Sequence, residues 1–207
     1  MGEIRIRYKN WNDITLSMAD DIQAIASNDE LSTAEKDIAI VALLCDAKEE
    51  EIWGLSVDEV NALREEVLWI GMPSSKRKNV GKVVKIGAYT LEQQEDITQM
   101  TYSQYVDFET YIKAEQVRRE DILTTILIPS GHKYNDGYDI KEVRDAIYKT
   151  LSVADADSIL FFFTQRLVSS IRRLASSLEK KRTMSEEERR QLRRIEEETT
   201  LMLGYLS

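Results

Sequence analysis

The sequence holds few side chains suited to nucleophilic or metal chemistry. Its 207 residues include one histidine, His132, and one cysteine, Cys45. His132 stands beside Lys133 in a polar turn, which favours a surface histidine over a member of a catalytic triad. Cys45 follows the apolar run 38–44, so we expect it to pack as a small hydrophobe. A lone cysteine excludes an internal disulfide and a multi-cysteine metal site.

Two groups of oxygen-bearing side chains could in principle bind a metal ion or act in acid–base catalysis. The stretch NDGYD at 135–139 resembles a calcium loop, but it lacks the alternating spacing and the terminal glutamate of an EF-hand. We favour a turn at Asp136 and Gly137, followed by a helix that Asp139 caps. The consecutive acids 49–51 point in different directions on a helix, so they indicate a solvated face rather than paired catalytic carboxylates.

Motifs for cofactors and membranes are also missing from the sequence. It has no Walker loop, dinucleotide fingerprint or zinc-protease motif, so we expect a non-enzymatic protein with no catalytic, cofactor-binding or metal-binding residues. No run reaches about 18 apolar residues, and the charged start 1–7 lacks an apolar signal region. We therefore expect a protein that is made in a cytoplasm, stays in an aqueous compartment and has no membrane partner.

Charge is distributed unevenly along the chain. The net charge is −9, and the segment 20–66 accounts for the whole acidic excess. Two later stretches, 76–85 and 166–182, are basic. Opposite charges in one chain suit docking between subunits, and the alternative is ordinary solvated surface. A chain this acidic is a poor general binder of nucleic acid, although a local basic patch could still bind it.

The pattern of apolar residues and breakers predicts a mainly α fold. It comprises a helical N-terminal group, a small β-hairpin, and an α-helical C-terminal part with a long helix. We divide the chain into an acidic helical N-terminal region (1–72), a basic linker with a possible hairpin (73–100), a helical core domain (101–182) and a charged C-terminal helix (183–207).

Local signals place the individual elements. Residues 3–8 alternate like a short strand, and 83–91 predict a hairpin that turns near Gly87. The sequence signature of a capping box occurs at Ser32, Ser56 and Thr101. Helices are expected at 15–27, 33–45, 57–70, 101–114, 118–128, after Asp139, at 153–182 and at 185–203.

Two apolar features suggest contacts. The aromatic run 161–163 lies in the most apolar helix, where a core role is favoured over an anchor for a partner. The last helix, 185–203, carries a thin apolar line between blocks of opposite charge, which predicts an oligomerisation or docking arm; the alternative is a solvated tail. Its candidate partner-binding residues are Leu192, Ile195, Met202, Arg189, Arg190, Arg193 and Arg194.

Four segments carry a resemblance to a known group of proteins. They are WNDITL at 11–16, MTYSQYVDF at 100–108, IPSGHKYNDGYD at 128–139 and SILFFF at 158–163. With these segments in this order, the chain resembles small helical proteins encoded among the virion genes of crAss-like phages of Bacteroides and related tailed phages. The resemblance covers about 10–175. The resemblance implies a cargo protein near the portal and tail, or a tail-assembly chaperone. It carries over no functional residues.

The expected function combines this resemblance with the empty motif search. The leading hypothesis is a non-enzymatic bacteriophage virion protein, packaged as cargo or built into the particle at the portal or tail. The alternatives are an assembly chaperone that is absent from the mature particle and, less favoured, a small enzyme or nucleic-acid regulator. The expected partners are portal, tail or capsid proteins and further copies of the chain, within a virion made in the bacterial host.

Overall fold

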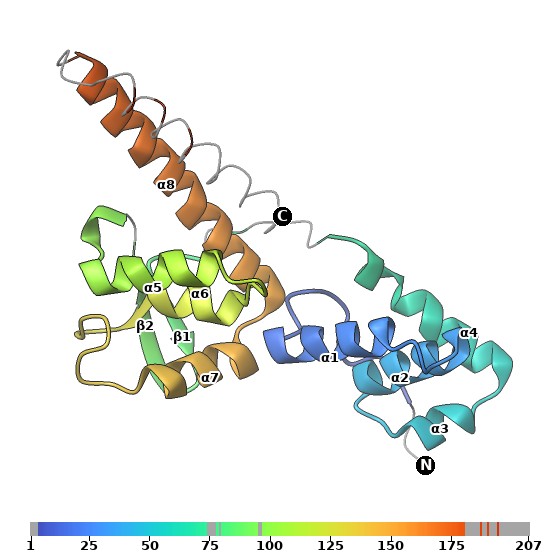
Figure 1. The fold of residues 1–207 in the computed structure, drawn as a ribbon. Helices are drawn as coiled ribbons and strands as arrows, with labels where there is room; N and C mark the ends of the chain where they lie inside the picture. The colour runs from blue at the N-terminus through green and yellow to red at the C-terminus, as the bar shows by residue number, and fades with distance from the viewer. Residues whose placement is uncertain are drawn as a thin grey trace. The chain divides into compact units, whose positions relative to one another are not determined.

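The chain is mainly helical, with a small antiparallel sheet in its second half, as the sequence predicts (Figure 1). The computed structural model describes residues 4–73, 78, 80–94, 97–180, 187, 190 and 194. It divides into two units. The first combines Met1–Lys76 with Ser152–Ala154, and the second combines Arg77–Leu151 with Asp155–Ser207.

The first unit is built from short helices with well-formed N-termini. They are α1 (Leu16–Ser27), α2 (Thr33–Cys45), α3 (Glu49–Trp53) and α4 (Val57–Glu66), followed by a 3-10 turn at Leu68–Gly71. The predicted capping boxes at Ser32 and Ser56 are both present, so each start is stabilised by reciprocal side-chain and backbone hydrogen bonds. Helix α2 is the centre of the core, because its residues Ile38, Ala39, Val41, Ala42, Leu44 and Cys45 are all buried.

Two predictions for this unit were wrong. Residues 4–8 form no strand; the Arg7 amide instead donates to the carbonyl of Leu44, 2.9 Å away, where α2 ends. The acids 49–51, which the sequence analysis treats as helical, lie in the short helix α3. The expected helix 57–70 ends at Glu66, and a tighter 3-10 turn follows it. Each error reflects tertiary partners that a local pattern does not contain.

Two tryptophans and a distant segment complete the first unit. The rings of Trp11 and Trp69 meet edge to face with centroids 5.2 Å apart, and the Trp11 indole donates to the carbonyl of Met72 at 2.8 Å. The Val153 amide donates to the carbonyl of Ile14 at 2.8 Å. Residues far apart in sequence therefore hold the start of α1 in place.

The second unit is formed around a three-stranded sheet. The predicted hairpin is present as β1 (Val83–Ile86) and β2 (Tyr89–Gln93), with Gly87 at φ +56° in its turn. A third strand, β3 (Leu127–Pro129), pairs with β2. The segment 73–100, which the sequence analysis separates from the core domain, thus contributes its hairpin to the sheet of the second unit.

Four described helices belong to the same unit as this sheet. They are α5 (Tyr102–Ile112), α6 (Arg119–Ile126), α7 (Ile140–Thr150) and α8 (Val153–Lys180). The expected helix 118–128 ends at Ile126, because the next three residues pair with β2 as a strand. Gln104 in the capping box of α5 is buried, and its amide donates to the carbonyl of Thr125 at 2.6 Å, which joins α5 to α6.

The long helix α8 buries its first half and continues well past the other helices of its unit (Figure 1). Leu160, Phe163 and Leu167 are buried at helical spacing, whereas Arg172 and Arg173 are exposed. None of the helices among the described residues is long and apolar enough to cross a membrane.

Candidate docking surface

His132 is held by its own loop rather than by partners typical of a catalytic site. It is exposed, as predicted; its Nδ1 lies 3.1 Å from the carbonyl oxygen of Asp136, and its ring meets Tyr138 edge to face. Gly137 has a φ of +76°, and a Cβ built there would lie 2.9 Å from the His132 ring. The turn at 136–137 therefore needs the glycine.

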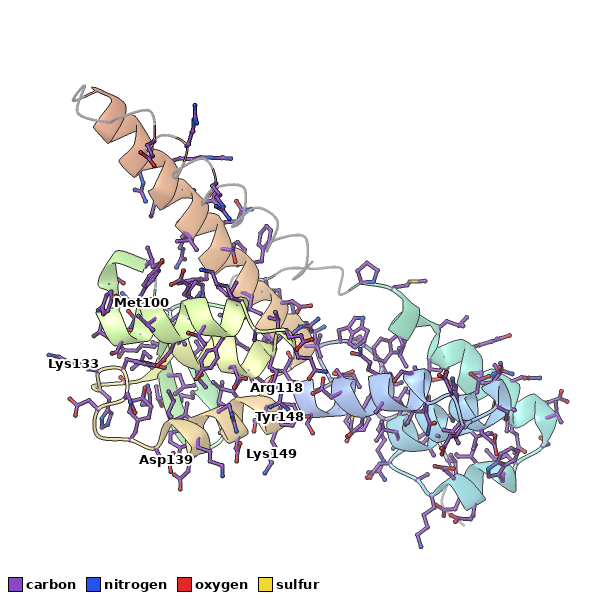
Figure 2. The ribbon with its side chains drawn as sticks, in the orientation of Figure 1. Met100, Arg118, Lys133, Asp139, Tyr148 and Lys149 are labelled. Atoms are coloured by element: carbon purple, nitrogen blue, oxygen red, sulfur yellow. The ribbon has the colours of Figure 1, made fainter. Side chains whose placement is uncertain are left out.

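The loop that follows β3 ends in the predicted helix cap. The Asp139 carboxylate accepts a hydrogen bond from the Lys141 amide at 2.8 Å, at the start of α7. Figure 2 labels Lys133 within this loop and Asp139 at its end. Across the part of the chain that is described, no three His, Cys, Asp or Glu side chains are grouped as a metal site requires.

A tyrosine ties this loop to α5. Tyr134 is buried, and its hydroxyl donates to Asp107 Oδ2 at 2.8 Å. Burial, and then the hydrogen bond to Asp107, raise the pKa of Tyr134 far above its ordinary value. The hydroxyl thus stays protonated and fixes the loop. Burial likewise raises the pKa of the Cys45 thiol, with Glu66 adding to the shift, so this buried cysteine is a weak nucleophile.

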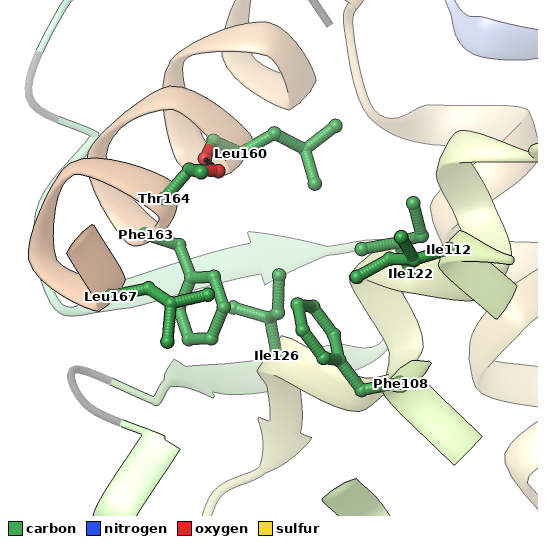
Figure 3. A pocket seen from close by; sticks show the side chains of 8 residues that line it. All are labelled: Phe108, Ile112, Ile122, Ile126, Leu160, Phe163, Thr164 and Leu167. Carbon is green, nitrogen blue, oxygen red and sulfur yellow. Dashed lines mark hydrogen bonds between the residues drawn. The ribbon is translucent and has the colours of Figure 1, made fainter. Parts of the chain in front are cut away.

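An apolar hollow lies between three helices of the second unit (Figure 3). Its cavity volume is about 10 Å³, which is room for about one water molecule. Among the described residues of its wall Thr164 is the one polar side chain, and its hydroxyl donates to the carbonyl of Leu160 at 2.6 Å. The described part of the wall is therefore apolar, with this hydroxyl already paired. Its lining residues are Phe108, Ile112, Ile122, Ile126, Leu160, Phe163, Thr164 and Leu167.

The clearest docking feature of the first unit lies where α3 meets α4. Trp53 is 55% exposed at the end of α3, and Val57 is 76% exposed at the start of α4. The acids 49–51 and Asp58 around them are exposed as well. Large exposed apolar side chains among charged ones are typical of protein–protein contacts. We call this exposed group, which is Trp53, Val57, Asp58 and the acids 49–51, the acidic face; its members are neighbours in sequence between 49 and 58.

Sequence reasoning missed this surface. The acids 49–51 were interpreted as a solvated helix face, which their exposure confirms, but the exposure of the neighbouring Trp53 was not anticipated. No local signal indicated this exposure, because it depends on how α3 packs against α2, which lies earlier in the chain.

Most of the predicted docking arm, 185–203, lies outside the described residues. Among its candidate residues, Leu192, Ile195, Met202, Arg189 and Arg193 fall outside the described residues. Arg190 and Arg194 are helical and exposed.

Comparison with protein-family models, with curated proteins and with solved structures finds no match for this chain. The fold and the exposed side chains define the class of protein: it is mainly helical, is divided into two units, and exposes acidic and apolar side chains in the first unit.

Proposed function

We propose that this chain is a non-enzymatic docking protein of a tailed-phage particle, packaged as cargo or built in near the portal and tail. The observation that carries the docking role is the exposed Trp53 on an acidic unit. The phage setting is supported by the resemblance of the segments 11–16, 100–108, 128–139 and 158–163 to virion proteins of crAss-like phages.

The acidic face favours a partner with a basic surface and an apolar socket. Residues 4–73 contain 15 acidic and 6 basic side chains, so the first unit carries a strong negative field. Tryptophan is among the residues that most often dominate binding energy at interfaces, because it buries a large rigid surface. The partner in this proposal is a virion protein of the portal, tail or capsid, with basic side chains surrounding a site for the indole.

Several copies in one particle are part of the same proposal. Residues 74–207 hold 22 basic and 21 acidic side chains, with basic residues gathered at 76–85 and 166–182. A chain with one acidic unit and separate basic stretches suits repeated docking around a symmetric portal–tail axis.

The experiment is incorporation of variants into particles, measured by mass spectrometry of purified virions. Trp53→Ala should leave the melting temperature near that of the wild type, because the side chain is half exposed, and should lower incorporation about tenfold or more. The matched control is Tyr102→Ala, which removes an aromatic side chain that is 83% exposed in the second unit. Tyr102→Ala should be incorporated normally.

Two results would overturn parts of this proposal. Equal incorporation of Trp53→Ala and the wild type would remove the acidic face as the docking surface. A wild-type chain that is produced during infection but absent from purified virions would replace the virion role with that of an assembly chaperone.

A further inference from the structure

The sheet of the second unit has the order β1-β2-β3, so its edge strands among the described residues are β1 and β3. Just beyond β3, the Ser130 amide donates to the carbonyl of Thr90 at 2.8 Å. Because hydrogen-bonded positions alternate along an antiparallel ladder, Leu127 and Pro129 are turned to the outer edge. The Leu127 amide already donates to the carbonyl of Leu123 in α6, and Pro129 has no amide hydrogen. The outer edge of β3 therefore offers these two positions no free donor, and a proline there opposes pairing with a further strand.

The edge of β1 keeps its backbone groups available. The Gln93 amide donates to the carbonyl of Lys82 at 2.8 Å, so the even-numbered positions of β1 are the ones bonded to β2. The peptide groups of Val83 and Lys85 consequently point away from β2. Within the described part of the chain, neither peptide group has a hydrogen-bond partner. An exposed edge with unpaired amides and carbonyls is a template for another strand.

The side chains of β1 define the pattern of the strand that would pair with it. Val84 and Ile86 are buried, with 8% and 1% exposure, and continue the apolar inner face of the sheet. Val83 is 51% exposed, and Lys85 on the same face is exposed as well. Because side chains alternate between the faces of a sheet, the added strand must alternate apolar and polar residues.

Charge on β1 selects the polar residues of that strand. Lys85 forms no ion pair with the described residues. The nearest carboxylate on β2, that of Glu92 opposite Val83, accepts a hydrogen bond from the hydroxyl of Ser130 beyond β3. Opposite charges across a strand pair are favourable and like charges are not. An acidic strand therefore fits this edge, whereas antiparallel pairing with a second copy of β1 would bring two Lys85 side chains together.

We propose that β1 is a docking edge that accepts an extended acidic segment of a partner protein as an additional strand. The backbone of that segment pairs with Val83 and Lys85, and a carboxylate lies across from Lys85 on the exposed face. In this mode of recognition, main-chain hydrogen bonds provide affinity and alternate side chains provide specificity. The site lies in the second unit, so its failure in a test would leave the role of the acidic face unchanged.

Amide hydrogen exchange, followed by NMR on the full chain, tests the proposal residue by residue. The probe is a short end-blocked peptide in which glutamate alternates with valine. In the free protein, the amides of Val83 and Lys85 should exchange much faster than those of Val84 and Ile86, which are bonded to β2. Saturating peptide should slow exchange at Val83 and Lys85 on the order of tenfold. Protection of these two amides before peptide is added, or no slowing after it is added, would overturn the proposal.

Two comparisons test the preference for an acidic strand. A peptide with lysine in place of glutamate should give no protection, and Lys85→Glu should weaken binding of the glutamate peptide about fivefold. The matched control is Lys133→Glu, the same change of charge at an exposed position in the loop after β3, and it should bind the glutamate peptide like the wild type. Equal binding of both peptides to the wild type, or an unchanged affinity in Lys85→Glu, would refute the selection of an acidic partner.

Discussion

Replacing Phe163 with alanine should destabilise the second unit far more than replacing its neighbour Phe162. Phe163 is 1% exposed, and its ring meets Phe108 edge to face with centroids 5.5 Å apart. Truncating a fully buried phenylalanine costs about 3–5 kcal/mol, and loss of the aromatic pair adds to the cost of the lost area. Because the side chain already borders a hollow, its removal enlarges an existing void, and we expect a loss of about 4 kcal/mol.

Phe162→Ala is the matched comparison from the same helix. Phe162 is only half-buried and packs against Phe161 with centroids 5.4 Å apart, so about 1–2 kcal/mol should be lost. Urea unfolding followed by far-ultraviolet circular dichroism measures both variants. Tryptophan fluorescence serves as an internal control, because Trp11, Trp53 and Trp69 all belong to the first unit. A loss for Phe162→Ala that equals or exceeds the loss for Phe163→Ala would refute the assignment of the core face of α8.

Three further changes test local features. Ser32→Ala removes the side-chain acceptor of a capping box and should cost about 1 kcal/mol of unfolding free energy by urea denaturation. The pKa of Tyr134 in the folded state lies above its unfolded value of about 10. The contribution of this tyrosine to the free energy of unfolding is therefore present below pH 10 and is lost as the pH rises above it. Melting temperatures from pH 8 to 11 should fall more steeply for the wild type than for Tyr134→Phe. Gly137→Ala forces an L-residue into a positive φ and a close approach to His132, so it should lower the melting temperature more than His132→Ala, which alters an exposed side chain.

Features that depend on neighbours in sequence were predictable. The capping boxes at Ser32, Ser56 and Thr101 and the cap at Asp139 lie where the sequence places them. Each needs only a side chain and an amide two or three residues away, so the local sequence contains the whole interaction. The hairpin turning at Gly87 was predictable for the same reason.

Features that depend on distant partners were not predictable. Residues 127–129 continue an apolar helical pattern, yet they form β3 because the edge of β2 accepts them, with Leu91 opposite Pro129. The alternating residues 4–8 have a strand pattern but meet the end of α2 instead of another strand. The same reasoning explains why the exposure of Trp53 was missed: whether a tryptophan is covered depends on the packing of α2 and α3, not on the five residues of its own helix.

Docking through the acidic face depends on charge as well as on the exposed indole of Trp53. Residues 4–73 carry a net charge of −9, so this docking should weaken as salt screens it. Titration of the partner at increasing salt measures this dependence. Binding that stays equally tight at high salt would contradict a docking surface built on these charges.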